Sequence, residues 1–218
     1  MAKAGLKYAA PAGSLKATVI TWKPGKPIHR IHSSAYAETQ SNPSARGNAR
    51  FSPIRDAAGE IIPVLYGGST MDCALMETVF RDVPYTSDLK NVDRVRLEGL
   101  VHSVVVAKAG LSLIDLGNVA LRKLGIDRAH LIDTTKACYP DTRKWAEAFY
   151  RQFPDCQGLR WISRQDDSAE AVLLFGNRIP AGTLTVARAA ESLLIRGYAA
   201  LPVLHLARKI GAKLTGRI

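Results

Sequence analysis

Four polar residues able to take part in catalysis interrupt segments that are otherwise apolar or built from small residues. They are Arg50 in "ARFSP", Tyr66 in "IPVLYGGST", Glu77 in "CALMETVF" and Ser163 in "GLRWISRQ". A carboxylate among small apolar neighbours is costly unless it is paired or performs chemistry. Glu77 is therefore the first candidate for a functional residue.

The spacing before Glu77 predicts a cleft. Tyr66 ends an apolar run, two glycines follow, and a helix is predicted over residues 69–81. A strand, a glycine turn and a helix in this order would place Tyr66 and Glu77 around one cleft. A simpler alternative stays open, because Arg81 lies four residues after Glu77 and could form a surface ion pair worth about 0.2–0.5 kcal/mol. Taken singly, Tyr66, Arg50 and Ser163 also fit a core aromatic, a surface charge and a strand serine.

Taken together with their spacing, these residues resemble the RES-domain family. Its pattern of R(F/W), PVLY, a serine and AL.E, followed by G and (Y/W).S, is matched by "ARFSP", "IPVLYGGSTMDCALMET" and "GLRWISR". The early hydrophobic-R-I element of the family is matched by "HRIHSS" around Arg30. The resemblance extends from about Ile28 to Phe175.

The resemblance implies an enzyme that cleaves the nicotinamide–ribose bond of NAD. NAD would be a substrate and not a cofactor, and inorganic phosphate would be the co-substrate of an NAD phosphorylase. Cleavage gives the ribose oxocarbenium character, as in glycoside hydrolysis, and a carboxylate such as Glu77 would stabilise that cation. Nicotinamide leaves as a neutral molecule, so no strong general acid is needed. A protein ADP-ribosyltransferase and an NAD glycohydrolase are the alternatives within this enzyme class.

The remaining roles are also implied by the resemblance and by residue type. Arg50 would bind phosphates through its planar donors, and Arg30 is a second phosphate candidate. Tyr66 would bracket the nicotinamide ribose, and Ser163 would donate a hydrogen bond to the nicotinamide amide or to a phosphate. Arg164 is a weaker candidate because alternation along a strand points it away from Ser163.

Family membership further implies the toxin of a toxin–antitoxin pair. The expected partner is an antitoxin with a helix-turn-helix DNA-binding domain that blocks the cleft. The sequence leaves open the acceptor, the identity of the antitoxin and whether the protein forms a homo-oligomer or a hetero-oligomer with it.

The net charge of +11 indicates an anionic partner. It leaves a distant alternative, a basic nucleic-acid-binding module, but no aromatics are interleaved on a basic stripe, and no direct nucleic acid is expected. The three cysteines and five histidines form no metal-ligand spacing, so no metal is expected. The chain has no long apolar run and no visible signal peptide, and a cytoplasmic location without membrane contact is expected.

Strands and helices do not alternate as βαβ units, which predicts an α+β fold. The family's likeness to ADP-ribosyltransferases implies two small antiparallel sheets around a cleft with flanking helices. We expect a leader over 1–15, a catalytic domain over 16–180 and a helical basic segment over 181–218 packed on the same domain. Strands are predicted at 16–22, 28–36, 60–68, 159–164 and 169–177, with two or three more within 94–116, and helices at 118–126 and 141–153.

Overall fold

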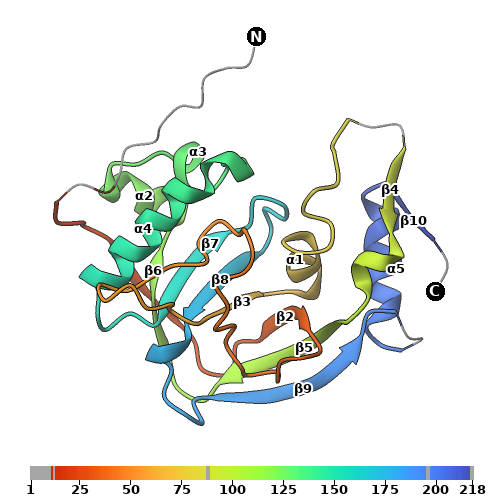
Figure 1. Cartoon of the computed structure of the whole chain (residues 1–218), viewed down its shortest axis with the longest axis horizontal. Coiled ribbons are helices and arrows are strands. Elements are labelled where there is room, and N and C mark those ends of the chain that lie inside the picture. Colours follow the sequence, from red (N-terminus) through yellow and green to blue (C-terminus); the bar gives the residue numbers. More distant parts are fainter. Residues whose placement is uncertain (1–10, 12, 87–88, 195–196, 217–218) are drawn as a thin grey trace.

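The structure is a computed structural model that describes residue 11 and residues 13–86, 89–194 and 197–216. It is an α+β fold, as predicted, in which one large curled sheet carries helices on its concave side (Figure 1). The sheet has eight strands in the order β1-β6-β7-β8-β3-β2-β5-β9. These strands are β1 (Thr18–Trp22), β2 (Ile28–Ser33), β3 (Val64–Gly68), β5 (Leu100–Ala107), β6 (Leu111–Asp115), β7 (Gly158–Ile162), β8 (Glu170–Phe175) and β9 (Leu184–Ser192).

The expected division into two small antiparallel sheets was wrong. The eight strands form one continuous sheet because β3 pairs with β8 on one side and with β2 on the other. The second sheet has only β4 (Lys90–Asp93) and β10 (Ala212–Thr215), and this pair is parallel. Within the large sheet β6 and β7 are also parallel, while the other neighbouring strands are antiparallel.

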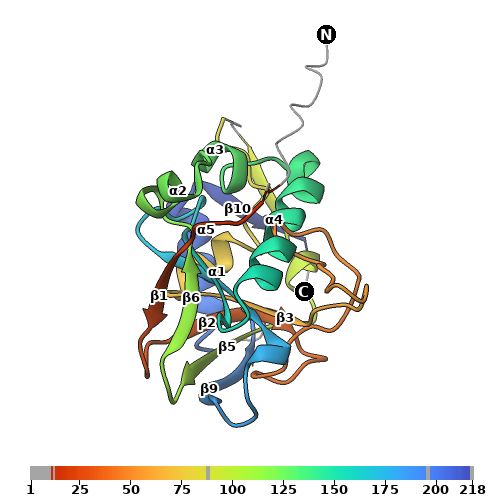
Figure 2. The same ribbon diagram turned by 90° about the vertical axis from the view of Figure 1, so that its left-hand side faces the viewer.

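Helices lie at two places around the concave side of the sheet (Figures 1 and 2). Helices α2 (Asn118–Leu124), α3 (Arg128–Leu131) and α4 (Tyr139–Gln152) gather beside β6 and β7. Helix α5 (Ala200–Lys209) packs with β10 at the other end of the molecule, and α1 (Met71–Met76) lies between the two groups. Short 3₁₀ turns complete the described elements at Arg94–Leu97, Lys136–Cys138 and Gly176–Arg178.

Two predicted helix boundaries needed correction. Helix α1 begins after its N-cap Thr70, whose Oγ1 accepts the backbone N–H of Cys73 at 3.0 Å. It ends at Met76 instead of continuing to Arg81. Helix α4 starts at Tyr139, two residues before the predicted start at Asp141, which lies in its first turn.

The chain after Ala181 is not wholly helical. Its first element is strand β9, which pairs along β5, and the helix α5 and the strand β10 follow. Alanines make the β9 sequence read as helical, but the open edge of β5 supplies backbone partners that override this weak preference. Strand β9 pairs with β5, and helix α5 contacts α1. None of the helices in the described ranges is long and apolar enough to cross a membrane.

Buried apolar side chains form three clusters, two of which pack helices on the rest of the fold. The largest lies between α4 and strands β7 and β8 and includes Trp145, Phe149 and Trp161. A second cluster joins α1 to α5 and contains Leu75 and Leu206. The third is formed by side chains of the strands, among them Trp22 of β1, Val105 of β5 and Leu113 of β6. Of the expected leader, residues 1–10 and 12 lie outside the described residues.

Candidate active site

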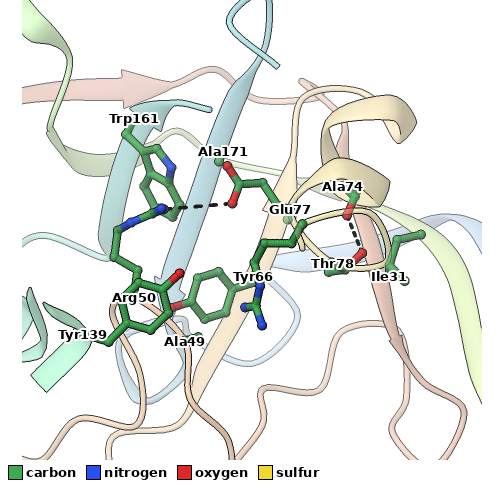
Figure 3. Close-up of a pocket in the computed structure, with 12 residues that line it drawn as sticks. Ile31, Ala49, Arg50, Tyr66, Ala74, Glu77, Thr78, Tyr139, Trp161 and Ala171 are labelled. Atoms are coloured by element: carbon green, nitrogen blue, oxygen red, sulfur yellow. Dashed lines mark hydrogen bonds and ion pairs between the residues drawn. The ribbon is translucent and has the colours of Figure 1, made fainter. Parts of the chain in front are cut away.

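A pocket of about 210 Å³ opens between α1, the concave face of the sheet and the segment around Arg50 (Figure 3). Its polar groups are few, and most of its wall is aromatic or aliphatic. The lining residues are Ile31, Ala49, Arg50, Tyr66, Gly67, Ala74, Glu77, Thr78, Arg81, Tyr139, Trp161 and Ala171. Three of the four signature residues therefore share one pocket.

Two glycines bring Glu77 to this pocket. Glu77 is the C-cap residue of α1, and its backbone N–H donates to the carbonyl of Cys73 at 2.9 Å. A Cβ on Gly68 would stand 2.9 Å from Cys73 Sγ and 3.0 Å from the Ala74 nitrogen. The neighbouring Gly67 has a similar constraint against Ile28. Gly68 thus lets the helix lie close to β3, Gly67 lets β2 lie close to β3, and the end of the helix delivers the carboxylate.

Ser163 holds the Glu77 carboxylate from behind. Its Oγ donates to Glu77 Oε1 at 2.6 Å and accepts the backbone N–H groups of Gln165 and Asp166 at 3.0 and 3.1 Å. The residue is 0% exposed and does not line the pocket. The expected contact between Ser163 and the substrate is therefore not supported, because its hydroxyl is already committed to Glu77. Ser163 is therefore a positioning residue that orients the Glu77 carboxylate.

Arg50 faces the same carboxylate from the opposite side. Its Nη1 lies 4.0 Å from Glu77 Oε2, and Figure 3 shows the two groups turned toward each other. The Arg50 side chain is 7% exposed, and its Nε has no hydrogen-bond partner among the described residues. Thr142 of α4 donates to the Arg50 carbonyl, which anchors this segment to the helix. The guanidinium also lies 5.8 Å from the Tyr139 ring centroid.

Tyr66 combines a pocket wall with a structural hydrogen bond. Its hydroxyl accepts the backbone N–H of Phe51 at 3.2 Å, which ties the segment after Arg50 to β3. Burial raises the pKa of the Tyr66 phenol to about 12, so the side chain stays neutral near pH 7. Its ring stands edge-on to Trp161 with the centroids 6.4 Å apart. The residue therefore offers an aromatic surface to a ligand.

Arg30 is not brought to this pocket. Its guanidinium donates to the backbone carbonyls of Ala37, Glu38 and Gln40, and the residue is buried. Burial lowers the pKa of Arg30 to about 10, which leaves it charged near pH 7. These bonds hold the 37–40 loop against β2, and they do not support the expected role in binding a substrate phosphate.

The sequence reasoning missed three pocket residues. Arg81 was considered only as an ion-pair partner of Glu77, but the helix ends before it and its Nε lies 3.7 Å from Asp82 Oδ1. Tyr139 enters from the start of α4. Trp161 is 1% exposed, and its indole N–H has no hydrogen-bond partner within the described ranges. Strand alternation could have identified Trp161, which lies two residues before Ser163 and so on the same face of an extended strand.

The pocket supplies a carboxylate, two arginines and aromatic walls, a combination suited to a ligand with a positive ring and anionic groups. The part of the chain that the structure describes contains no cluster of three or more His, Cys, Asp or Glu residues able to hold a metal. Cys73 lies near Glu77, but burial raises the pKa of its thiol to about 12, which argues against a nucleophile.

Two comparisons with known proteins, one with solved structures and one with family models, give matches. A search of solved structures finds a chain in the crystal structure of the M. tuberculosis MbcT–MbcA toxin–antitoxin complex. The TM-score is 0.59 and the identity 16%, over 87% of this chain and 92% of that chain, so the likeness concerns the fold. No curated protein gives a significant match. The family model described as the RES domain matches residues 27–195, which cover all four signature residues, and the chain therefore belongs to the RES domain family.

Proposed function

We propose that this protein cleaves the nicotinamide–ribose bond of NAD and transfers the ADP-ribosyl group to inorganic phosphate. The observation that carries the proposal is the Glu77 carboxylate, held between Ser163 and Arg50 at the wall of an aromatic pocket. The Glu77 side chain is 17% exposed, so a ligand in the pocket can reach it. Its bond from Ser163 fixes the orientation of the carboxylate.

The reaction needs electrostatic stabilisation more than proton transfer. As the C–N bond breaks, its electron pair moves to the nicotinamide nitrogen, and positive charge develops on the ribose. Glu77 would face that charge at a distance where an effective dielectric near 20 gives about 4 kcal/mol. A phosphate oxygen then supplies the electron pair for the new C–O bond, which yields ADP-ribose 1″-phosphate and neutral nicotinamide.

The other pocket residues would select and orient the dinucleotide. Tyr66 and Trp161 offer flat surfaces for the nicotinamide and its ribose. Arg50 has both a charge and an unused Nε donor for a phosphate oxygen. The Arg50–Glu77 distance of 4.0 Å is longer than a hydrogen bond, so the arginine is not locked onto the carboxylate.

The same proposal includes an antitoxin partner. It is supported by membership of the RES domain family and by a fold shared with a chain of a toxin–antitoxin complex. We propose that the antitoxin covers the pocket and carries a helix-turn-helix DNA-binding domain. The protein would then act as a toxin in the cytoplasm, where NAD and phosphate are both present.

Phosphorus NMR of the purified protein incubated with NAD tests the reaction. Phosphate-dependent formation of ADP-ribose 1″-phosphate supports phosphorolysis, whereas free ADP-ribose that forms regardless of phosphate indicates a glycohydrolase. Labelled protein after incubation with labelled NAD indicates protein ADP-ribosylation instead. Intact NAD under every condition, in protein that retains a cooperative thermal transition, contradicts the whole proposal.

A further inference from the structure

A second cavity, of about 460 Å³, adjoins the candidate active site. The two cavities share Arg50, Arg81 and Tyr139, so they lie side by side with these three residues between them. The second is lined by Arg50, Arg81, Asp82, Val83, Tyr85, Thr134, Thr135, Lys136, Tyr139, Arg164 and Gln165. We propose that this second cavity, named here the phosphate recess, binds a phosphate group during the reaction.

The charge of the phosphate recess favours an anion. Four cationic side chains line it, and Asp82 is the one carboxylate among its lining residues. That carboxylate is shared, since Lys136 Nζ lies 2.7 Å from Asp82 Oδ2 and Arg81 Nε lies 3.7 Å from Oδ1. Arg50 also faces the Glu77 carboxylate at 4.0 Å. Two carboxylates cannot neutralise all four cations, so the recess keeps a surplus of positive charge.

Unused hydrogen-bond donors point to the same ligand. Thr134 is 2% exposed, and its Oγ1 has no hydrogen-bond partner among the described residues. The same holds for the Nε atoms of Arg50 and Arg81. Buried polar groups are normally hydrogen-bonded. Three groups beside this recess lack a hydrogen bond, although Arg81 Nε has a 3.7 Å ion pair with Asp82, and together they indicate a missing partner that accepts hydrogen bonds. Phosphate oxygens accept several such bonds at once.

The backbone near Thr134 is held in place before any ligand arrives. Arg164 Nη1 donates to the Thr134 carbonyl at 2.6 Å, which uses one arm of that arginine and fixes the loop. Gln165 Nε2 donates to the Arg81 carbonyl at 3.1 Å, so the segments that carry Arg81 and Arg164 are joined. The Thr134 hydroxyl is therefore presented by a braced loop.

Size also separates the two cavities. The first, at about 210 Å³, is smaller than the roughly 300–1,000 Å³ pockets that hold drug-sized ligands. A dinucleotide whose nicotinamide end lies beside Glu77 must extend beyond it. The phosphate group in the recess comes either from the pyrophosphate of the dinucleotide or from inorganic phosphate as the acceptor. The source of the phosphate, NAD or the acceptor, rests on the proposed function. The binding of an anion in the recess does not depend on it.

Thr134→Val gives the sharpest test. It keeps the shape of the side chain and removes a hydroxyl that has no partner in the unliganded protein, so the melting temperature should stay the same or rise. Binding of inorganic pyrophosphate, measured by calorimetry at low salt, should weaken about tenfold. A purely structural role for Thr134 predicts the reverse, a lower melting temperature and unchanged binding.

Lys136→Gln with a matched control tests the charge. Lys136 is half exposed and its loss should weaken pyrophosphate binding about fivefold. Lys144→Gln removes an equivalent cation that is likewise bonded to an aspartate, Asp141 at 3.1 Å, but does not line the recess. The control variant should bind pyrophosphate as the wild type does. Equal binding by the Thr134, Lys136 and Lys144 variants would overturn the proposal.

Kinetics then identify the source of the phosphate. A higher KM for NAD in Thr134→Val and Lys136→Gln assigns the recess to the pyrophosphate, and a higher KM for inorganic phosphate assigns it to the acceptor. Pyrophosphate binding that depends on Thr134, in protein that leaves NAD intact, would reject the proposed function and keep the phosphate recess. NAD cleavage with unchanged KM values and unchanged pyrophosphate binding in both variants would keep the proposed function and reject the phosphate recess.

Discussion

The hydroxyl of Ser163 reaches the carboxylate of Glu77 at 2.6 Å while it accepts two backbone N–H groups from the turn that follows it. These two N–H groups occupy the acceptor sites of the hydroxyl, so its proton has one direction left, toward Glu77. The turn after β7 thus fixes the orientation of a side chain that lies 86 residues away in sequence.

Ser163→Ala should therefore lower kcat about 10- to 100-fold with little change in the KM for NAD. The serine does not line the pocket, so substrate binding keeps its contacts, but the carboxylate loses its fixed orientation. Two partly buried N–H groups lose their acceptor as well, which should cost about 1 kcal/mol of unfolding free energy. Steady-state kinetics and chemical denaturation measure the two effects.

Ser168→Ala is the matched control for that variant. Ser168 lies in the same turn, and its Oγ donates to Asp166 Oδ1 at 2.6 Å without contact to Glu77. Its loss should leave kcat within about twofold of the wild type. If the two alanine variants lose the same activity, the role assigned to the Ser163–Glu77 bond is wrong.

Glu77→Gln should reduce NAD turnover by about a thousandfold. The substitution keeps the size of the side chain and removes its charge. That charge would stabilise the ribose cation by about 4 kcal/mol, which corresponds to roughly a thousandfold in rate. Nicotinamide release measured by chromatography gives the rate, and thermal unfolding should stay close to the wild type. Glu98→Gln, at an exposed position, is the control and should retain full activity. Activity of Glu77→Gln within tenfold of the wild type would refute the electrostatic role.

Gly68→Ala tests the close approach of helix and sheet that positions Glu77. The added Cβ would meet Cys73 Sγ at 2.9 Å and the Ala74 nitrogen at 3.0 Å, so α1 must move away from β3. Overpacking of this kind costs about 1–3 kcal/mol, and a shift of the helix should also lower kcat. Cys73→Ala in the same chain should restore only part of the loss, because the backbone contact remains. Wild-type activity and melting temperature in Gly68→Ala would contradict this account.

The convergence of Tyr66 and Glu77 could be predicted from the sequence because it depends mainly on local order, whereas Arg50 was expected in the site only through the family resemblance. An apolar strand, a glycine pair and a short helix place Tyr66 and Glu77 by themselves, and these elements were predicted correctly in type. The end of the helix at Met76 was not predicted. Because the helix stops there, Arg81 forms an ion pair with Asp82 and not with Glu77. Local pattern cannot show where a helix stops when its C-cap is decided by packing against a distant strand.

Other parts of the site depend on contacts that no local pattern encodes. Arg30 has the right residue type for phosphate, but the 37–40 loop folds back and supplies carbonyls to its guanidinium. Strand β9 forms because the edge of β5 is open, although its alanine-rich sequence favours a helix. Thr134 and Lys136 join the recess through a loop between α3 and α4, a connection that spacing alone does not reveal.

A buried histidine pair should make stability depend on pH. His102 is 0% exposed, and its Nε2 lies 3.0 Å from Nδ1 of His29 on the neighbouring strand. One ring must donate to the other, so both cannot be protonated without breaking the bond. Burial, followed by the nearby charges of His29 and Arg188, lowers the pKa of His102 to about 4, and burial lowers the pKa of His29 as well.

The unfolded chain therefore binds more protons than the folded one between about pH 4 and the ordinary histidine value near 6.5. The stabilising contribution is complete above about pH 6.5 and is lost as the pH falls toward 4, with an upper bound of about 3 kcal/mol for His102. Urea unfolding at pH 7, 5.5 and 4.5 measures it. His102→Gln should lose less stability over this range than the wild type, whereas His205→Gln, at an exposed position, should follow the wild type. Parallel pH profiles for all three proteins would show that His102 does not carry this dependence.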